Sequence, residues 1–136
     1  MSAFELDGRI DRDSDLIKRL DLCQLRIQND SRWPWLVMVP QRPGMTEVFE
    51  LSEADQALLH AEVAHVGAAL KRATGATKIN TAAIGNIVRQ LHVHVIARFE
   101  GDPNWPGPVW GFGQAVPYAE VGHRQIFLNR LVEALS

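Results

Sequence analysis

The chain has 136 residues, of which 46% are hydrophobic and 22% charged, a composition typical of a single globular domain over residues 1–136. No apolar run approaches the ~20 residues that a bilayer-spanning helix requires, which excludes a membrane-spanning protein, and the hydrophobic content excludes a disordered one. Fourteen Lys and Arg residues against sixteen Asp and Glu residues give a net charge of −2. This balance argues against general binding to a nucleic-acid backbone.

Cysteine content and the N-terminal residues predict the cellular compartment. The one cysteine, Cys23, has no partner for an internal disulfide. The first seven residues, M-S-A-F-E-L-D, lack the basic region and apolar core of a signal peptide. We therefore expect a reduced, cytoplasmic protein.

The first half of the chain predicts a β-hairpin followed by a long helix. Residues 22–29 and 35–39 are short apolar or alternating runs around the turn-forming segment N-D-S-R-W-P. The segment P-Q-R-P-G then ends the pairing, because proline donates no amide hydrogen. Ser52 can cap a helix over residues 53–73, where apolar residues recur at helical spacing.

The second half predicts two more strands and a second helix. Gly75 is a helix stop signal, and the strands at 78–83 and 91–98 are joined by I-G-N-I-V-R-Q. A Gly- and Pro-rich irregular segment follows, and residues 125–135 again have helical period. This order of elements favours an α+β fold with a largely antiparallel sheet.

The motif Q-L-H-V-H-V-I is the strongest chemical signal in the chain. Side chains alternate along a strand, so Gln90, His92 and His94 are predicted on one face and the apolar residues between them on the other. The two imidazoles would lie about 7 Å apart along the strand. One neutral ring could attack an electrophile such as a phosphorus centre, while the other stabilises an oxyanion or protonates a leaving group.

Two other interpretations of this histidine pair stay open from the residues alone. Two histidines can simply occupy the polar face of an amphipathic strand. They can also be two metal ligands, but a metal site usually needs a third or fourth ligand. No Cys or carboxylate cluster has ligand spacing, and His60, His65 and His123 could contribute only if the fold brought them close.

The motif, preceded by I-N-T-A-A-I-G-N-I-V and by a hairpin ending in V-M-V-P-Q-R, resembles the histidine triad (HIT) superfamily of nucleotide hydrolases and transferases. The family signature is His-φ-His-φ-His-φ-φ, with φ apolar, and the resemblance covers residues 23–98, closest to a bacterial subgroup. It implies a HIT-like α+β fold: a largely antiparallel sheet of about five strands, one long helix and a C-terminal helix. It also implies a homodimer that needs no cofactor and no metal for its covalent step.

The resemblance assigns catalytic roles to the motif. His92 would attack the α-phosphate of a dinucleoside polyphosphate, a nucleoside phosphoramidate or a similar compound, and form a nucleotidyl-histidine. His94 would hydrogen-bond the phosphate or the departing group, with its positive charge most valuable as negative charge develops. The backbone around Gly85 and the Asn86 side chain would hold phosphate oxygens.

Three further residues match positions that contact phosphate or ribose in the family. Asn80 corresponds to an Asn or Gln near the phosphate or ribose. Asn29 and Asp30, at the end of the first long strand, are candidates for binding the ribose hydroxyls. The alternative for all three is turn chemistry, since Asn and Asp often bond their own backbone at strand ends.

The chain also departs from the family pattern. Gln90 replaces the first histidine of the triad, and an amide can still hold an imidazole but cannot carry charge. Ile87 stands where many relatives have Ser or Thr donating to the α-phosphate. These departures favour an alternative function, a nucleotide-binding or regulatory module with little or no turnover.

The irregular segment 102–118 contains Trp105 and Trp110. Either ring could stack on a base, but large aromatic residues more often anchor such a loop on the core or at a dimer interface. Arg98 is a possible phosphate partner by charge, because it shares the strand face of His92.

Overall fold

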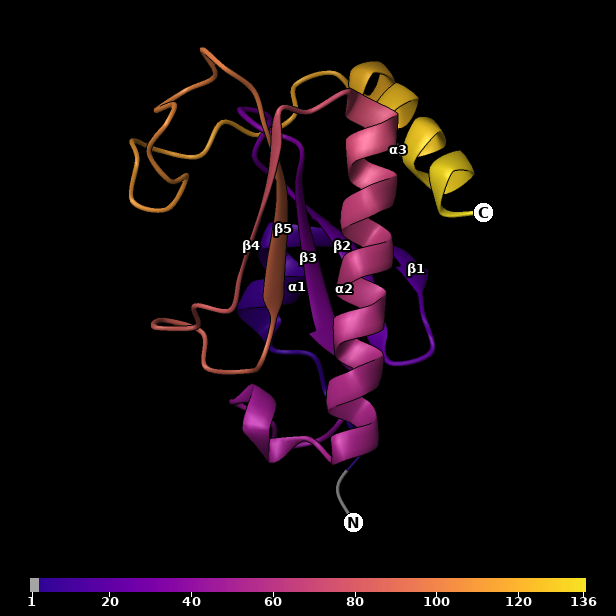
Figure 1. Cartoon of the computed structure of the whole chain (residues 1–136). Helices are drawn as coiled ribbons and strands as arrows, with labels where there is room; N and C mark the ends of the chain where they lie inside the picture. The colour runs from indigo at the N-terminus through magenta and orange to yellow at the C-terminus, as the bar shows by residue number, and fades with distance from the viewer. Residues whose placement is uncertain (1–2) are drawn as a thin grey trace.

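The computed structural model describes residues 3–136. The predicted domain and the N-terminal segment inspected for a signal peptide both include residues 1 and 2, which lie outside the described part. Its strands form one five-stranded antiparallel sheet in the order β1-β2-β3-β5-β4 (Figure 1). The elements are α1 (Gly8–Asp13), β1 (Ser14–Arg19), β2 (Cys23–Gln28), β3 (Trp35–Pro40), the 3-10 helix η1 (Val48–Glu50), α2 (Glu53–Thr74), β4 (Lys78–Ala82), β5 (Val93–Arg98) and α3 (Val121–Leu135).

This architecture confirms the predicted α+β class, its largely antiparallel sheet of five strands, the long helix and the C-terminal helix. The long helix begins and ends as its caps predict. The Ser52 hydroxyl accepts the Asp55 backbone N–H, and Gly75 takes the left-handed conformation at φ +70°. The C-terminal helix begins at 121, four residues before the predicted start.

The sequence analysis missed α1 and β1, which together cover residues 8–19. Strand β1 lies at the edge of the sheet, and of its six residues only Ser14 is buried. An edge strand of this kind shows no apolar alternation, and a helix of six residues is too short to show a helical period. Strand β5 begins at Val93 rather than at 91, because its pairing with β3 ends at Met38 and the Leu91 N–H bonds the Met45 carbonyl instead.

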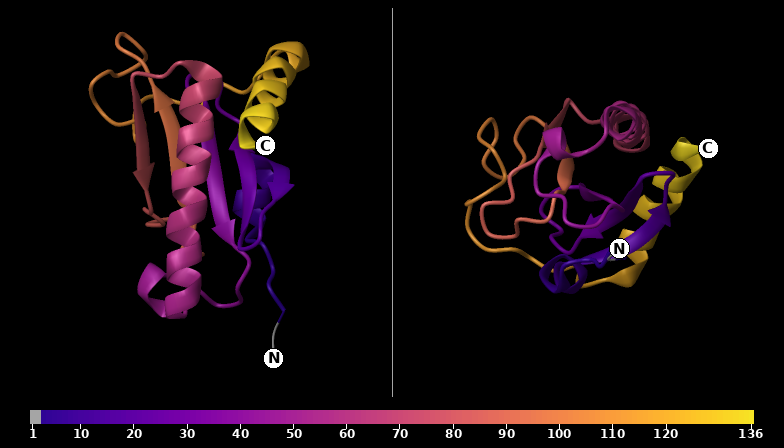
Figure 2. Two further views of the ribbon diagram at one scale, coloured as in Figure 1. Left: turned by 45° about the vertical axis from the view of Figure 1, so that its right-hand side comes forward. Right: turned by 90° about the horizontal axis from the view of Figure 1, so that it is seen from below.

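Helices α2 and α3 cover one face of the sheet and bury its main core (Figures 1 and 2). The strand residues that fill this core are those with one parity: Leu25 and Ile27 on β2, Leu36 and Met38 on β3, and Val93, Val95 and Ala97 on β5. Burial of such apolar side chains is worth about 1.5–3 kcal/mol each. The other parity on β5, which includes His94, must therefore point to the opposite face.

A smaller apolar cluster lies on that opposite face, with α1 on the far side of the sheet from α2 (Figure 2). Ile10 of α1 packs there with Val37 and Ile96 of the sheet. Two irregular segments also contribute to the cluster, through Leu6 before α1 and Val109 after β5. The face that carries the histidines is thus bordered by the N-terminal segment and by the loop after β5.

A buried ion pair holds the loop after β5 against the sheet. Arg98 is 1% exposed, and its Nε and Nη2 each donate to the Asp102 carboxylate at 2.8 Å. Its Nη1 donates to the Gly107 carbonyl at 2.7 Å, and Trp33 Nε1 donates to the Pro103 carbonyl at 3.1 Å. The Arg98 guanidinium is therefore occupied by contacts within the fold. The phosphate-binding role that its charge suggested does not fit this arrangement.

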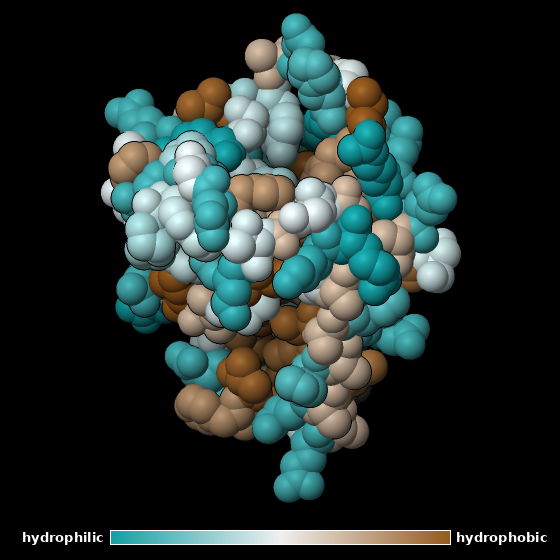
Figure 3. Space-filling model, turned by 45° about the horizontal axis from the view of Figure 1, so that its top comes forward, coloured by the Kyte–Doolittle hydropathy of each residue, from teal (hydrophilic) through white to brown (hydrophobic). Residues whose placement is uncertain are grey.

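On the surface drawn in Figure 3, hydrophilic residues cover much of the molecule and apolar residues form smaller patches between them. Within residues 3–136, no helix combines the length and apolar character that crossing a bilayer requires.

We predict that Asp102→Ala lowers the free energy of unfolding by about 3–5 kcal/mol, because it leaves the buried Arg98 without its counter-charge. Asp13→Ala is the matched control, since Asp13 pairs with the exposed Arg12 and such pairs contribute at most about 1 kcal/mol. Urea unfolding of both variants measures the difference. Equal losses in the two variants would contradict the anchoring role of Arg98.

Candidate active site at the start of β5

His92 and His94 lie side by side on the face of the sheet that α2 and α3 leave uncovered. His94 is paired in register with Val37 of β3, and His92 immediately precedes β5. Their ring centroids are 4.9 Å apart, at an interplanar angle of 72°, and each residue is 8% exposed. The predicted display of two imidazoles on one face is therefore present, although His92 stands just outside the strand itself.

Hydrogen bonds to the two Nδ1 atoms fix complementary tautomers. His92 Nδ1 lies 2.6 Å from the Gln90 backbone carbonyl, which can only accept, so Nδ1 carries the proton and the neutral ring has its lone pair on Nε2. Trp35 Nε1 donates to His94 Nδ1 at 2.9 Å, so the His94 proton is on Nε2. The pair thus offers one lone pair and one N–H donor.

The environment of His94 keeps its ring neutral. Burial lowers the pKa of His94 to about 3, and the neighbouring His92 shifts it in the same direction. Trp35 and Trp110 supply much of this apolar surrounding, with ring centroids 5.6 and 5.3 Å from that of His94. In the free protein His94 is therefore a neutral donor through its Nε2–H, whereas the positive charge expected from the resemblance concerned the reaction itself.

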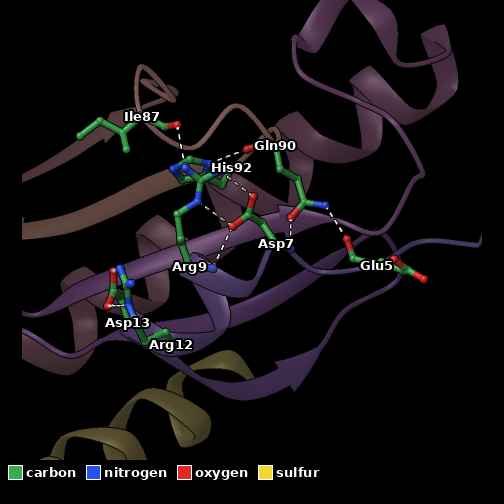
Figure 4. Close-up of polar contacts among 8 residues, drawn as sticks. All are labelled: Glu5, Asp7, Arg9, Arg12, Asp13, Ile87, Gln90 and His92. Atoms are coloured by element: carbon green, nitrogen blue, oxygen red, sulfur yellow. Dashed lines mark hydrogen bonds and ion pairs between the residues drawn. The ribbon is translucent and has the colours of Figure 1, made fainter.

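Gln90 does not hold the His92 ring through its side chain, which corrects the role expected for it. Its amide oxygen accepts the Asp7 backbone N–H and its amide nitrogen donates to the Glu5 carbonyl, both at 2.8 Å (Figure 4). Only its backbone carbonyl orients His92. Because every residue type supplies that carbonyl, orientation of His92 does not depend on a histidine at position 90.

Two cavities meet at His92. The larger, of about 580 Å³, is a groove between the η1 turn and the loop that joins β4 to β5, and it is lined by Gly85, Asn86 and Gln90 among others. The smaller, of about 90 Å³, is lined by His92 and His94. Gly85 has φ +68°, and a Cβ there would lie 3.0 Å from the Val88 carbonyl, so the loop requires glycine.

Asn80, by contrast, is not among the residues that line either cavity at His92. It lies opposite Ile96 on the edge strand β4, with its Oδ1 3.5 Å from Arg98 Nη1. The side chain therefore faces the buried ion pair, at the other end of β5 from His92.

The side chains of Asn29 and Asp30 also contact other residues of this chain. The Asn29 Oδ1 accepts the Tyr118 N–H at 3.1 Å, and Asp30, which is 2% exposed, pairs with Arg32 at 2.8 Å. Strand β2 ends at Gln28, one residue before the predicted end, so Asn29 and Asp30 belong to the turn. This arrangement is the turn chemistry that the sequence left open as the alternative to ribose binding.

Three polar residues of the smaller cavity were not predicted from the sequence: Arg9, Asp13 and Gln28. Gln28 is the last residue of β2 and has the strand parity of the site face, a signal that the predicted strand 22–29 already carried. Arg9 lies more than eighty positions before His92 in the sequence, and no local pattern connects the two.

Within residues 3–136, no group of three or more His, Cys, Asp or Glu side chains is arranged to hold a metal ion. His65 on α2 lies with its Nε2 3.1 Å from the Leu135 carbonyl, and the exposed His123 is beside Glu120. The helix histidines therefore do not join His92 and His94.

We predict that Trp35→Phe releases the His94 ring, because it removes the only N–H that bonds its Nδ1 among the described residues. In the wild type, ¹⁵N NMR should show His94 neutral at pH 5 with its proton on Nε2. In Trp35→Phe the ring should exchange between both tautomers. Trp33→Phe is the control, because its N–H bonds Pro103 instead. An unchanged tautomer in Trp35→Phe would contradict this account.

Comparison with known proteins places the site in a family. The HIT domain model matches residues 9–101, which include the histidine pair. A search of curated proteins finds no match.

Solved structures agree over almost the whole chain. A histidine triad protein from Sinorhizobium meliloti is 62% identical, with a TM-score of 0.93 and 96% of each chain covered. One from Bradyrhizobium japonicum is 40% identical, with a TM-score of 0.96, covering 99% of this chain and 100% of that one. One from Marinobacter aquaeolei is 38% identical, with a TM-score of 0.92 and the same coverage. On this evidence, and on the paired histidines at the start of β5, the chain belongs to the HIT family.

Proposed function

We propose that this protein is a nucleotide hydrolase or nucleotidyl transferase that acts on the α-phosphate of dinucleoside polyphosphates, nucleoside phosphoramidates or similar compounds. The observation that carries the proposal is the pair of complementary tautomers. His92 offers a lone pair on Nε2, and His94 offers an N–H donor on the adjacent ring. A nucleophile and an oxyanion donor side by side are the parts that phosphoryl transfer needs.

In the first step, the Nε2 lone pair of His92 forms a bond to the α-phosphorus, and the bond from phosphorus to the leaving group breaks with its electron pair. The ring of the nucleotidyl-histidine is then positively charged, and the Gln90 carbonyl that accepts its Nδ1–H stabilises this charge. His94 Nε2–H donates to a non-bridging phosphate oxygen. In the second step, the oxygen of water or another acceptor forms a bond to phosphorus and loses its proton to solvent. The bond from phosphorus to Nε2 breaks, and its electron pair returns to Nε2.

The loop residues Gly85 and Asn86 are the proposed phosphate-binding donors, through backbone N–H groups and the side-chain amide. Both line the same groove as His92, which supports this assignment. Asn80, Asn29 and Asp30 are not carried into the proposed site, because their polar atoms face other parts of the protein.

A homodimer in the cytoplasm is also part of the proposal, by the family resemblance. Strand β4 is an edge strand whose outer side has no partner strand among residues 3–136, which leaves backbone groups available to a second copy. The free Cys23 is buried, as suits a reducing compartment.

The alternative is a nucleotide-binding module with little or no turnover. One observation favours it: Ile87 is 82% exposed, and its side chain offers no hydrogen-bond donor at a position where, by the resemblance, many relatives carry a hydroxyl. The two functions share a ligand and differ in catalysis, so a single assay separates them.

We predict that the wild type releases AMP from adenosine phosphoramidate or diadenosine polyphosphates in metal-free buffer. His92→Asn should lower kcat/KM by roughly a thousandfold or more, since it removes the nucleophile. His60→Asn, at an exposed position of α2, is the matched control and should keep wild-type activity. Mass spectrometry of the quenched wild-type reaction should find one nucleotidyl group on the peptide that contains His92.

Two results would contradict the enzymatic proposal. Activity retained in His92→Asn would remove His92 as the nucleophile. Thermal stabilisation of the wild type by AMP, with no turnover of any substrate tested, would instead establish the binding module.

A further inference from the structure

We propose that Arg9 is a phosphate-binding residue of the site, and that Gln90 docks the N-terminal segment that carries it. The inference rests on the proposed function and deepens it. It assigns to Arg9 the phosphate oxygens on the side of the smaller cavity, while Gly85 and Asn86 remain the proposed donors on the side of the groove.

The Gln90 side chain fixes the N-terminal segment against the site. Its two amide hydrogen bonds, to the Asp7 N–H and the Glu5 carbonyl, join residues more than eighty positions apart in the sequence. Figure 4 shows the segment running past Gln90 and turning back, so that Asp7 and Arg9 lie beside His92. The Gln90 side chain therefore ties the N-terminal segment to the neighbourhood of the nucleophile.

Arg9 is held in place but retains free hydrogen-bonding capacity. Its Nε and Nη2 donate to the Asp7 carboxylate at 3.2 and 3.1 Å, and its Nη1 donates to the Ile87 carbonyl at 3.3 Å. A guanidinium has five N–H donors, so two remain for a ligand. The side chain is 49% exposed, which leaves these donors accessible.

The smaller cavity has the size and charge for a phosphate group. Its volume of about 90 Å³, against about 580 Å³ for the groove, suits a single phosphate group and is too small for a nucleoside. Among the described residues that line it, Arg9 alone carries a permanent positive charge, while Asp13 is paired with Arg12. His94, on the same cavity, is the neutral donor described above.

Arg9 also supplies a positive charge and hydrogen-bond donors, which the side chains of Gln90 and Ile87 do not provide together. Gln90 carries no charge, and the Ile87 side chain donates no hydrogen bond. The Arg9 guanidinium reaches the Ile87 backbone and so brings a cation to the very loop that has lost a donor. Asp7 opposes it in part: the hydrogen bonds from Arg9 hold the pKa of the Asp7 carboxyl below its usual value, so this neighbour stays anionic.

The test compares the affinities of AMP and adenosine, measured by isothermal titration calorimetry. Arg9→Gln should weaken AMP binding at least tenfold, the usual effect of losing a hydrogen bond to a charged group, and change adenosine binding by less than about twofold. Arg19→Gln is the matched control, because Arg19 is an exposed arginine at the end of β1 and lines neither cavity at His92, and it should change neither affinity. Arg9→Lys keeps the charge and should retain AMP binding within a few-fold even if the Gln variant folds poorly.

Asp7→Asn separates ligand binding from a merely structural ion pair. Asparagine can still accept the Arg9 backbone N–H that caps α1, but it removes the anion that competes for the guanidinium. We expect AMP to bind several-fold more tightly to Asp7→Asn. If Arg9 only stabilised the segment through Asp7, this variant would instead weaken AMP binding as much as Arg9→Gln.

Gln90 is tested as a positioning residue by a double-mutant cycle. Gln90→Ala should weaken AMP binding by a factor similar to that of Arg9→Gln, and should add little in the Arg9→Gln background, because both act through one group. Additive losses would overturn the docking role of Gln90.

These measurements need no turnover, so they separate this inference from the proposed function. Unchanged AMP affinity in Arg9→Gln overturns the inference, and so does a wild type that binds AMP no more tightly than adenosine. Activity retained in His92→Asn overturns only the assignment of the nucleophile.

Discussion

Strand β5 is buried on both faces, and its pleat constrains everything that surrounds the site. Val93, Val95 and Ala97 must face the helices to fill the core, so His94 and Arg98 must face the other way. A shift of one residue would exchange these sets and place charged and titratable groups in the core. Pairing on both sides, with β3 and β4, leaves the strand no room to slip. The site face is thus a consequence of how the core is packed.

Two segments from distant parts of the chain then close over that face. The N-terminal segment is hydrogen-bonded to the Gln90 side chain, just before β5. The loop after β5 is hydrogen-bonded to the Arg98 side chain, at the last residue of that strand. Together they remove His92 and His94 from water while leaving the groove at His92 open. Water exclusion strengthens the hydrogen bonds within the site, because the local dielectric constant falls. The same burial keeps His94 uncharged.

The departure from the triad takes on a definite physical meaning in this setting. His92 is oriented by a backbone carbonyl, so the residue at position 90 is free to do other work. Glutamine is well suited to bridge an N–H and a carbonyl of a neighbouring segment, since one amide both donates and accepts. His94 is likewise held by the Trp35 indole, whose N–H can only donate a hydrogen bond and therefore allows only the tautomer with a lone pair on Nδ1. The loss of the first histidine is therefore compatible with an ordered nucleophile.

The sequence by itself determined the features that depend on near neighbours: the α+β class, α2 with its Ser52 and Gly75 caps, and the alternation that displays His92 with His94. Local periodicity and capping encode these features. Strand β1, helix α1, and the partners of Asn29 and Asp30 were decided by packing, because an edge strand and a turn carry little pattern of their own. Only the tertiary structure decided which nitrogen of each histidine bears the proton. Trp35 lies 59 positions from His94, and Asp7 lies 83 from Gln90. Contacts between residues so far apart form only when the sheet is assembled.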